Sequence, residues 1–298
     1  MFIYESIISN FKCKSIFLMT RVYLLLSYLP LNFLYILSSF VSIFLPHVYR
    51  RKVVKKNLVN SFPNISKLEL ENLVGNFYAH FCDIFFETIK SYSISSKELK
   101  KRVIFSNIDE LNHKLEKKEK VLVLTSHQCN WEWLLLASQL NLNQPLNVIY
   151  KSISNRNIDK SLIKSRSRFG SKLIESKKAL LHIRRNIKKI GIIALVADQS
   201  PIKKNKKSWR ILLNQDTAFF KSVEYLPRLL NSHVYFASME RLSRGKYSVK
   251  FDLISTPNQN LNKDILSEYV WKLEHQIKQK PDEWLWTHKR WKYTREDI

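Results

Sequence analysis

The chain has 298 residues, enough for one α/β domain with an appendage, and its 45% hydrophobic content suffices for a core. Fifty Lys and Arg against 25 Asp and Glu give a formal net charge of +25, which points to nucleic acid, an anionic membrane surface or an acidic partner. Cys13, Cys82 and Cys129 show no C-x-x-C spacing, which argues against a disulfide framework or a zinc site. We expect a reducing compartment, no metal and no cofactor.

The first elements in chain order form an apolar segment. No residue between Arg21 and Arg50 carries a formal charge, and this length reaches the roughly 20 apolar residues that a bilayer core requires. Pro30, Asn32 and several serines interrupt the segment. A spanning helix and a bent helix lying in the interface therefore both fit this pattern.

A basic cluster follows the apolar segment. "RRKVVKK", Arg50 to Lys56, has five basic residues in seven positions, and the positive-inside rule places such a flank in the cytoplasm. We predict a membrane-anchoring segment over residues 1–49 and a domain over residues 50–298 that faces the cytoplasm.

The position of this cluster also bears on the choice of partner. The densest early basic run stands where anionic headgroups would lie, which favours an anionic membrane surface over nucleic acid. The chain has no recognisable nucleic-acid-binding module, and its aromatic residues follow apolar patterns and not the basic runs. We expect no nucleic-acid partner.

A long helix is predicted after the basic cluster. Ser66 and Glu69 form an S-x-x-E capping box, and the helical pattern continues to about Ile89. An aromatic stripe at helical spacing follows one face of it: Phe77, Phe81, Phe85 and Phe86. A membrane or acyl-chain surface would explain the stripe, but the spacing favours core packing.

Short apolar runs then alternate with helical patterns. The predicted strands are Val121 to Thr125, Leu146 to Tyr150, Ile192 to Val196, Val234 to Ser238 and Tyr247 to Ile254. The predicted helices lie near residues 131–140, 158–168, 176–189 and 263–279. This rhythm predicts an α/β fold with a mainly parallel or mixed sheet flanked by helices, preceded by an N-terminal membrane-anchoring helix.

The stretch "SHQCNWEW" follows the strand at Val121 to Thr125 and opens the next helix. His127 lies just past the strand's carboxyl end, where α/β folds place ligand sites. With Glu132 in the first helical turn, the carboxylate can accept from one imidazole nitrogen and leave the other as a base toward a hydroxyl. This pair would form the base half of an acyl-transfer site. A structural histidine beside a solvated glutamate fits the spacing equally well.

Further segments strengthen the functional interpretation. "KVLVLT" followed by H-x-x-x-x-E resembles the membrane-bound late acyltransferases of lipid A biosynthesis. Other landmarks of that family follow the same order here: "NLVNSFP" at Asn57 to Pro63, "RSRFG" at Arg166 to Gly170, "LVADQS" at Leu195 to Ser200 and "WLWTHKRWK" at Trp284 to Lys292.

The resemblance implies transfer of a fatty acyl group from acyl carrier protein to a hydroxyl of a membrane lipid, a lipid A precursor, at the cytoplasmic face of the bacterial inner membrane. It implies His127, Glu132 and Arg166 as catalytic residues, with Arg166 as first choice and Arg168 as second choice for stabilising the oxyanion. The implied substrate-binding residues are Asn130, Arg168, Asp198, Gln199, His288 and Arg290. Asp198 fits two roles, orienting an arginine or acting through structure alone.

Some features depart from the family pattern. The Asp-Gln segment lacks the following Phe-Phe-Gly loop and is followed by "KKNKK", which leaves other lipid acceptors open, a lysophospholipid or an aminolipid. A catalytically retired membrane-bound binding protein is a further alternative, disfavoured by the presence of both His127 and Glu132. The lysines of the run suit acidic acyl carrier protein, acceptor phosphates or a solvated loop: Lys203, Lys204, Lys206 and Lys207.

Two neighbours of the histidine are given no chemistry. Trp131 is expected to pack. Cys129 is expected to be a small buried residue, because direct transfer needs no enzyme thiol.

Overall fold

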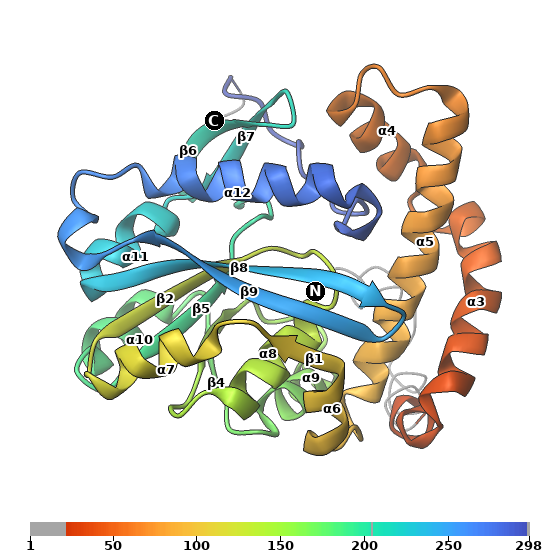
Figure 1. The fold of residues 1–298 in the computed structure, drawn as a ribbon. Helices are drawn as coiled ribbons and strands as arrows, with labels where there is room; N and C mark the ends of the chain where they lie inside the picture. The colour runs from red at the N-terminus through yellow and green to blue at the C-terminus, as the bar shows by residue number, and fades with distance from the viewer. Residues whose placement is uncertain (1–21, 204, 297–298) are drawn as a thin grey trace.

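A computed structural model describes residues 22–203 and 205–296 of the chain. Its main feature is a seven-stranded sheet in the order β1-β9-β8-β2-β5-β3-β4 (Figure 1). The strands are β1 (Val103–Phe105), β2 (Lys120–Thr125), β3 (Asn147–Tyr150), β4 (Lys172–Glu175), β5 (Ile192–Val196), β8 (Ser232–Ser243) and β9 (Lys246–Ser255). All neighbouring pairs are parallel except β8 with β9. The predicted fold class is confirmed.

Helices and a small second sheet surround this sheet. The described helices are α3 (Leu31–Val48), α4 (Arg51–Ser61), α5 (Lys67–Lys90), α6 (Ser96–Arg102), α7 (Ile108–Glu116), α8 (Trp131–Asn141), α9 (Arg156–Ser167), α10 (Ala179–Asn186), α11 (Ser222–Leu230) and α12 (Ile265–Gln279). Two short 3-10 segments cover Pro257–Gln259 and Pro281–Glu283. The antiparallel pair β6 (Lys207–Leu212) and β7 (Gln215–Phe220) forms the second sheet.

Strand β2 is buried on both faces, which explains its continuous apolar sequence. Leu122 and Leu124 pack into the core that includes α11 and α12. Val121 and Val123 pack into the core that includes α7 and α8. Figure 1 shows these helix pairs on opposite sides of the sheet.

The carboxyl ends of β2 and β5 form the place where the chain can build a site. The two strands are parallel neighbours, and Thr125 pairs with Val196 at their ends. After β2 the chain enters α8 on one face, whereas after β5 it reaches α11 on the other. Neighbouring strands whose connections diverge in this way leave a crevice at their carboxyl ends, where ligands of open α/β sheets bind.

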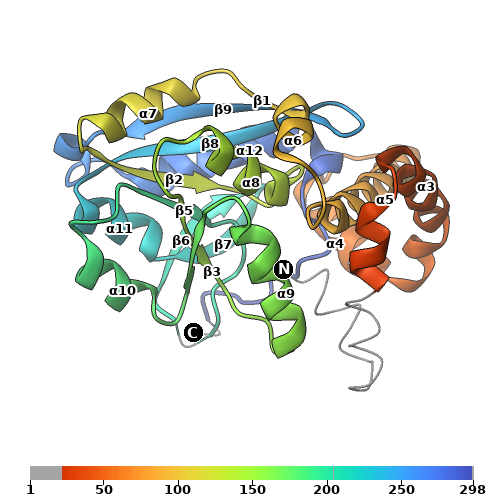
Figure 2. The same cartoon turned by 90° about the horizontal axis from the view of Figure 1, so that it is seen from below.

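Helices α3, α4 and α5 stand together at one end of the sheet (Figures 1 and 2). The predicted capping box of α5 is confirmed, with Ser66 and Glu69 each accepting from the other's backbone N–H. Core packing explains the aromatic stripe of α5, because Phe77, Phe81 and Phe86 are buried.

Helix α3 has two different faces. Its inner face packs on α5, and the Ser38 hydroxyl donates to Asp83 at 2.6 Å. Its outer face exposes an apolar stripe whose side chains are 46 to 81% exposed: Phe33, Ile36, Phe40, Ile43, Phe44 and Val48. Within the described residues, α3 is the helix long and apolar enough to cross a membrane by length and composition. The described chain begins with a helical segment over residues 22–28, separated from α3 at Pro30.

Candidate active site

His127 leaves the end of β2 and meets a carboxylate that follows β5. Its Nδ1 lies 2.6 Å from Asp198 Oδ1, and its backbone N–H donates to Asp198 Oδ2 at 2.8 Å. The Trp284 indole N–H also donates to Asp198 Oδ2, at 2.8 Å. All of these groups are buried. The adjacency of β2 and β5 therefore creates a His–Asp pair at the carboxyl ends of these two strands.

The charge of Asp198 fixes the imidazole tautomer. Burial raises the pKa of Asp198, but His127 and the donated hydrogen bonds outweigh burial and bring this pKa down to about 2. An ionised carboxylate only accepts hydrogen bonds, so the His127 ring donates from Nδ1. Its Nε2 then presents a lone pair, toward which the Gln199 amide nitrogen points at 3.2 Å. This is the arrangement of a general base.

The predicted pair of His127 with Glu132 is wrong. The Glu132 carboxylate accepts from the Trp131 indole at 3.2 Å and from Arg166 Nε and Nη2 at 2.8 and 2.5 Å. The physical reason is the course of the chain: the loop carries His127 toward β5, whereas the first turn of α8 carries Glu132 toward Arg166 at the end of α9. Cys129, between them, has a left-handed backbone with φ 52°.

Arg166 forms an ion pair with Glu132. Glu132 is buried and Arg166 is largely buried, with its side chain 11% exposed, and the guanidinium binds the carboxylate through two nitrogens. Burial raises the pKa of Glu132, but Arg166 outweighs burial and lowers it overall. Arg166 is thus a partner of an ionised carboxylate, which argues against its predicted role as oxyanion donor. Arg168 donates to the Ser91 carbonyl at 2.6 Å, near the end of α5.

Asn130 is a helix cap. Its side-chain oxygen accepts from the Trp133 backbone N–H at 2.8 Å, and its amide nitrogen donates to Glu87 at 2.6 Å. The residue is fully buried. Both ends of its amide are therefore engaged inside the protein, and its contact with substrate stays a prediction.

The segment that follows α12 completes the loop of His127. The Leu285 N–H donates to the His127 carbonyl at 3.1 Å, and the Cys129 N–H donates to the Glu283 carbonyl at 3.0 Å. Gln128 and Trp284 form an antiparallel bridge. The predicted residue His288 also lies in this segment.

The side chain of His288 is neutral and binds the backbone just after Gln199. Burial, together with the Arg290 cation, lowers the pKa of His288 to about 2. Its Nε2 accepts from the Ser200 backbone N–H at 3.1 Å. His288 therefore orders the chain that follows Asp198 and Gln199.

Arg290 is a buried cation close to the His–Asp pair. Its Nη1 donates to the Ser200 hydroxyl at 3.2 Å, and its guanidinium carbon lies 4.6 Å from the centre of the Phe219 ring. Among the described residues, Nε and Nη2 have no hydrogen-bond partner. Burial lowers the pKa of Arg290 to about 10, so the group keeps its charge at neutral pH. A buried cation with two unused donors is suited to an anionic oxygen.

Helix α4 and its N-cap residue donate hydrogen bonds to the backbone of the segment that follows α12. The Asn57 amide donates to the carbonyls of Trp286 and His288 at 2.9 and 3.0 Å. Arg50 donates to the Thr287 carbonyl at 3.0 Å. The "NLVNSFP" segment thus supports the site indirectly, because Asn57 binds the backbone of the C-terminal segment.

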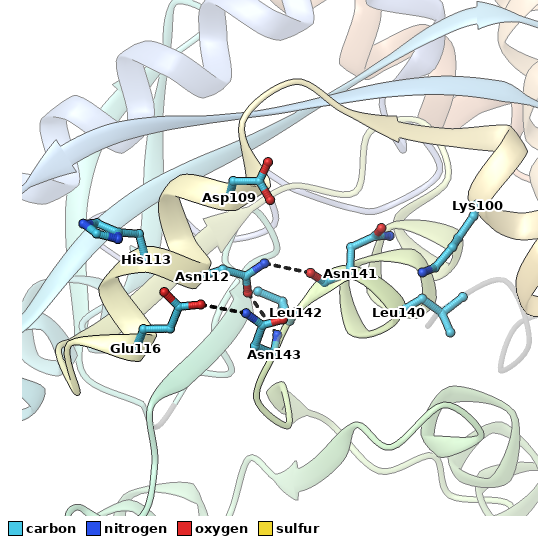
Figure 3. A pocket seen from close by; sticks show the side chains of 9 residues that line it. All are labelled: Lys100, Asp109, Asn112, His113, Glu116, Leu140, Asn141, Leu142 and Asn143. Atoms are coloured by element: carbon cyan, nitrogen blue, oxygen red, sulfur yellow. Dashed lines mark hydrogen bonds between the residues drawn. The ribbon is translucent and has the colours of Figure 1, made fainter.

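A separate surface hollow of about 600 Å³ lies away from this site (Figure 3). Side chains of α7 and of the end of α8 line it, with Lys100 of α6. His127 lies before the first residue of α8, whereas the hollow lies at the opposite end of this helix. The eleven residues of α8 extend roughly 16 Å and separate the two. None of the predicted site residues lines the hollow.

A histidine ring bound to a buried carboxylate, at the carboxyl edge of a mostly parallel sheet, is an arrangement suited to hydroxyl activation and group transfer. The sequence profile of the bacterial lipid A biosynthesis acyltransferases matches residues 9–293, and the chain belongs to this family. The family resemblance predicted from the sequence is confirmed. No curated protein matches the chain.

Proposed function

We propose that the protein transfers a fatty acyl group from acyl carrier protein to a hydroxyl of a lipid A precursor at the cytoplasmic face of the inner membrane. The observation that carries this proposal is the His127 imidazole, bound to Asp198 through Nδ1 and presenting Nε2. The family membership supplies the reaction class.

In the proposed reaction, the acceptor hydroxyl takes the place of the Gln199 amide on His127 Nε2. As the hydroxyl oxygen attacks the thioester carbonyl, its proton passes to Nε2, and Asp198 stabilises the resulting imidazolium. The carbon–sulfur bond then breaks, and the leaving thiolate takes the proton from Nε2. The products are an ester and a free thiol.

We assign stabilisation of the tetrahedral oxyanion to Arg290. The support is its burial, its charge and the absence of hydrogen-bond partners for Nε and Nη2 among the described residues. Preorganised donors of this kind are typically worth about 2.7 to 4 kcal/mol. Glu132 and Arg166 then support the site from α8 and α9 as an ion pair.

The outer apolar stripe of α3 is the proposed membrane contact of the anchoring segment, residues 1–49, with the acyltransferase domain over residues 50–298. The inner face of α3 meets Asp83, which also pairs with Arg241 and Arg244. A bilayer core disfavours such charges. We therefore favour α3 lying in the interface, with the basic start of α4 near anionic headgroups.

The carrier protein is expected to approach through complementary charge. Lys203 and Lys206 stand in the predicted basic run, and Lys204 lies outside the described residues. Lys207 donates to the backbone carbonyls of Lys203 and Asn205, so it also orders the loop. An acidic protein surface would meet these lysines with attraction that salt weakens.

Purified protein with acyl carrier protein thioester and a lipid A precursor should give a product heavier by one acyl chain, detected by mass spectrometry. A lysophospholipid acceptor serves as comparison and should react more slowly. Neutral acyl-pantetheine tests the donor, because its rate should depend less on salt than the rate with the carrier protein. Acylation of the lysophospholipid with none of the lipid A precursor would contradict the proposed acceptor.

The protein should stay with membranes through a high-salt wash, because salt does not screen apolar burial. The triple variant Ile36→Gln, Phe40→Gln, Ile43→Gln should be released, since burying each such side chain stabilises binding by about 1.5 kcal/mol or more. A matched control changes three exposed leucines elsewhere to glutamine: Leu181, Leu253 and Leu261. Sedimentation measures the fraction of each variant that is released from the membranes. Equal release of both triple variants would reject the stripe on α3 as the membrane contact.

A further inference from the structure

Glu87 is a buried carboxylate that the proposed chemistry does not use. It lies in the last two turns of α5 and is 0% exposed. Three side-chain donors surround it: the Tyr35 hydroxyl at 2.7 Å, the Tyr247 hydroxyl at 2.7 Å and the Asn130 amide at 2.6 Å. These donors come from α3, β9 and the loop of His127, so Glu87 joins three separate parts of the fold.

A carboxylate at this position needs an explanation beyond stability. Burial raises the pKa of Glu87 to about 7, against the three donors that lower it. Apolar residues of similar volume often stabilise a core as well as buried charged groups do. The nearby carboxyl of Asp83, one turn earlier on α5, disfavours the charge of Glu87 further. Glu87 fixes the orientation of the three side chains that donate to it.

The most consequential of these groups is Asn130, because it begins α8. Its amide nitrogen is held by Glu87, which aims its oxygen at the Trp133 N–H. The Trp133 indole donates to the Glu87 carbonyl at 3.0 Å, giving a second connection between α5 and α8. Asn130 therefore has one orientation, set from α5.

The loop that Asn130 ends is short and strained. Cys129 stands directly before Asn130 with φ 52°, a conformation uncommon for non-glycine residues. The Cys129 thiol donates to Glu283 at 2.7 Å, on the side of the C-terminal segment. The loop between His127 and α8 is thus held from two sides, by Glu283 and, through Asn130, by Glu87.

We propose that Glu87 is a positioning residue, which acts through Asn130 to keep His127 in its catalytic geometry, and that Tyr35 ties the membrane-facing helix α3 to the same carboxylate. This inference rests on the proposed function for its catalytic consequence. It assigns to α3 a second role, support of the active-site loop.

The kinetic test compares two buried carboxylates of α5 that both contact α3. Glu87→Gln replaces one acceptor oxygen with an amide nitrogen, so at least one of the three hydrogen bonds donated to the carboxylate must reverse its direction or be lost. We expect kcat to fall about 10- to 100-fold with KM within about twofold, since displacements near 1 Å can cost about 10²-fold in rate. Asp83→Asn is the matched control, because Asp83 binds Ser38 but not the loop. The folded Asp83→Asn protein should have a kcat within about twofold of the wild-type value, although its thermal stability falls.

Tyr35→Phe tests the connection to α3. It removes one hydroxyl that donates to Glu87, and we expect kcat to fall about 2- to 10-fold, the fold-change that corresponds to one hydrogen bond. Unchanged turnover in Tyr35→Phe would reject the part of the proposal that concerns α3. Unchanged turnover in Glu87→Gln, or equal losses in Glu87→Gln and Asp83→Asn, would reject the positioning role.

A spectroscopic measurement separates this inference from the proposed function. In protein labelled with ¹⁵N-histidine, His127→Ala assigns the ring signals of His127. We expect Glu87→Gln to shift or broaden those signals and Asp83→Asn to leave them in place. If the wild type transfers no acyl group with the stated donor and acceptor, the proposed function fails. The comparison of the His127 signals then still tests whether Glu87 positions His127. Identical signals in wild type and Glu87→Gln would overturn the inference.

Discussion

Replacing His127 with alanine is expected to lower kcat for acyl transfer by about 10² to 10⁴-fold, the usual contribution of a general base. Asp198→Asn should also lower kcat strongly, because a neutral amide no longer enforces the Nδ1–H tautomer or stabilises the imidazolium. Since Asp198 acts through the imidazole, the double variant His127→Ala, Asp198→Asn should be scarcely slower than His127→Ala alone. Steady-state kinetics of the three purified variants measure this.

Glu132→Gln provides the comparison. Its carboxylate binds Arg166 and not His127, so its effect on kcat should add to that of His127→Ala. Circular dichroism and thermal unfolding serve as controls for folding. Near wild-type turnover in His127→Ala, or non-additivity with Glu132 in place of Asp198, would show that the roles of the two carboxylates are reversed or that His127 is structural.

Removing Arg166 is expected to have the largest effect on stability. Arg166→Met leaves the buried Glu132 carboxylate without its cation, and breaking a buried pair in this way typically costs about 3 to 5 kcal/mol. The double variant Glu132→Gln, Arg166→Met should recover much of this loss, because no uncompensated charge remains. Urea unfolding of purified protein in detergent measures the free energies.

The matched control for this pair is an exposed one. Lys278 pairs with Glu274 at i,i+4 on α12, and the Lys278 side chain is 53% exposed. Lys278→Met should therefore change the free energy of unfolding by less than about 1 kcal/mol. If Arg166→Met is as mild as Lys278→Met, then the Glu132–Arg166 pair contributes little and Glu132 is free for another role.

Local signals predicted much of the fold. The S-x-x-E box at Ser66 predicted the start of α5, because capping depends on residues three apart. Apolar runs predicted β2, β5 and β9, since strands buried on one or both faces must be apolar at those positions. The short strands β4 and β6 were missed, because "KLIE" and "KSWRIL" contain polar residues and are little buried.

The partner of His127 was harder to predict from the sequence. His127 and Asp198 are 71 residues apart, and they meet because β5 inserts between β2 and β3 in the sheet order. Strand order depends on long-range packing, which a single sequence does not reveal. A useful signal was present: both residues follow a predicted buried strand, and parallel strands end at the same edge.

Glu87 was also missed, although the sequence marks it. In "FCDIFFETIK" the acidic residues Asp83 and Glu87 stand four apart, among residues of an apolar helical face. Acidic residues are almost never fully buried unless they are paired. Their position on this face therefore indicates buried polar partners, but it does not say which part of the chain supplies them.

The support that α4 gives to the C-terminal segment has a consequence for the order of events during synthesis. Arg50 and Thr287, which form a hydrogen bond, are 237 residues apart. At typical synthesis rates of about 5 to 20 residues per second, roughly 10 to 50 seconds separate their emergence from the ribosome. During that interval the apolar helix α3 has been made, whereas the loop of His127 still lacks Trp284 and Leu285. The apolar helix is therefore complete well before the segment that supports the loop of His127.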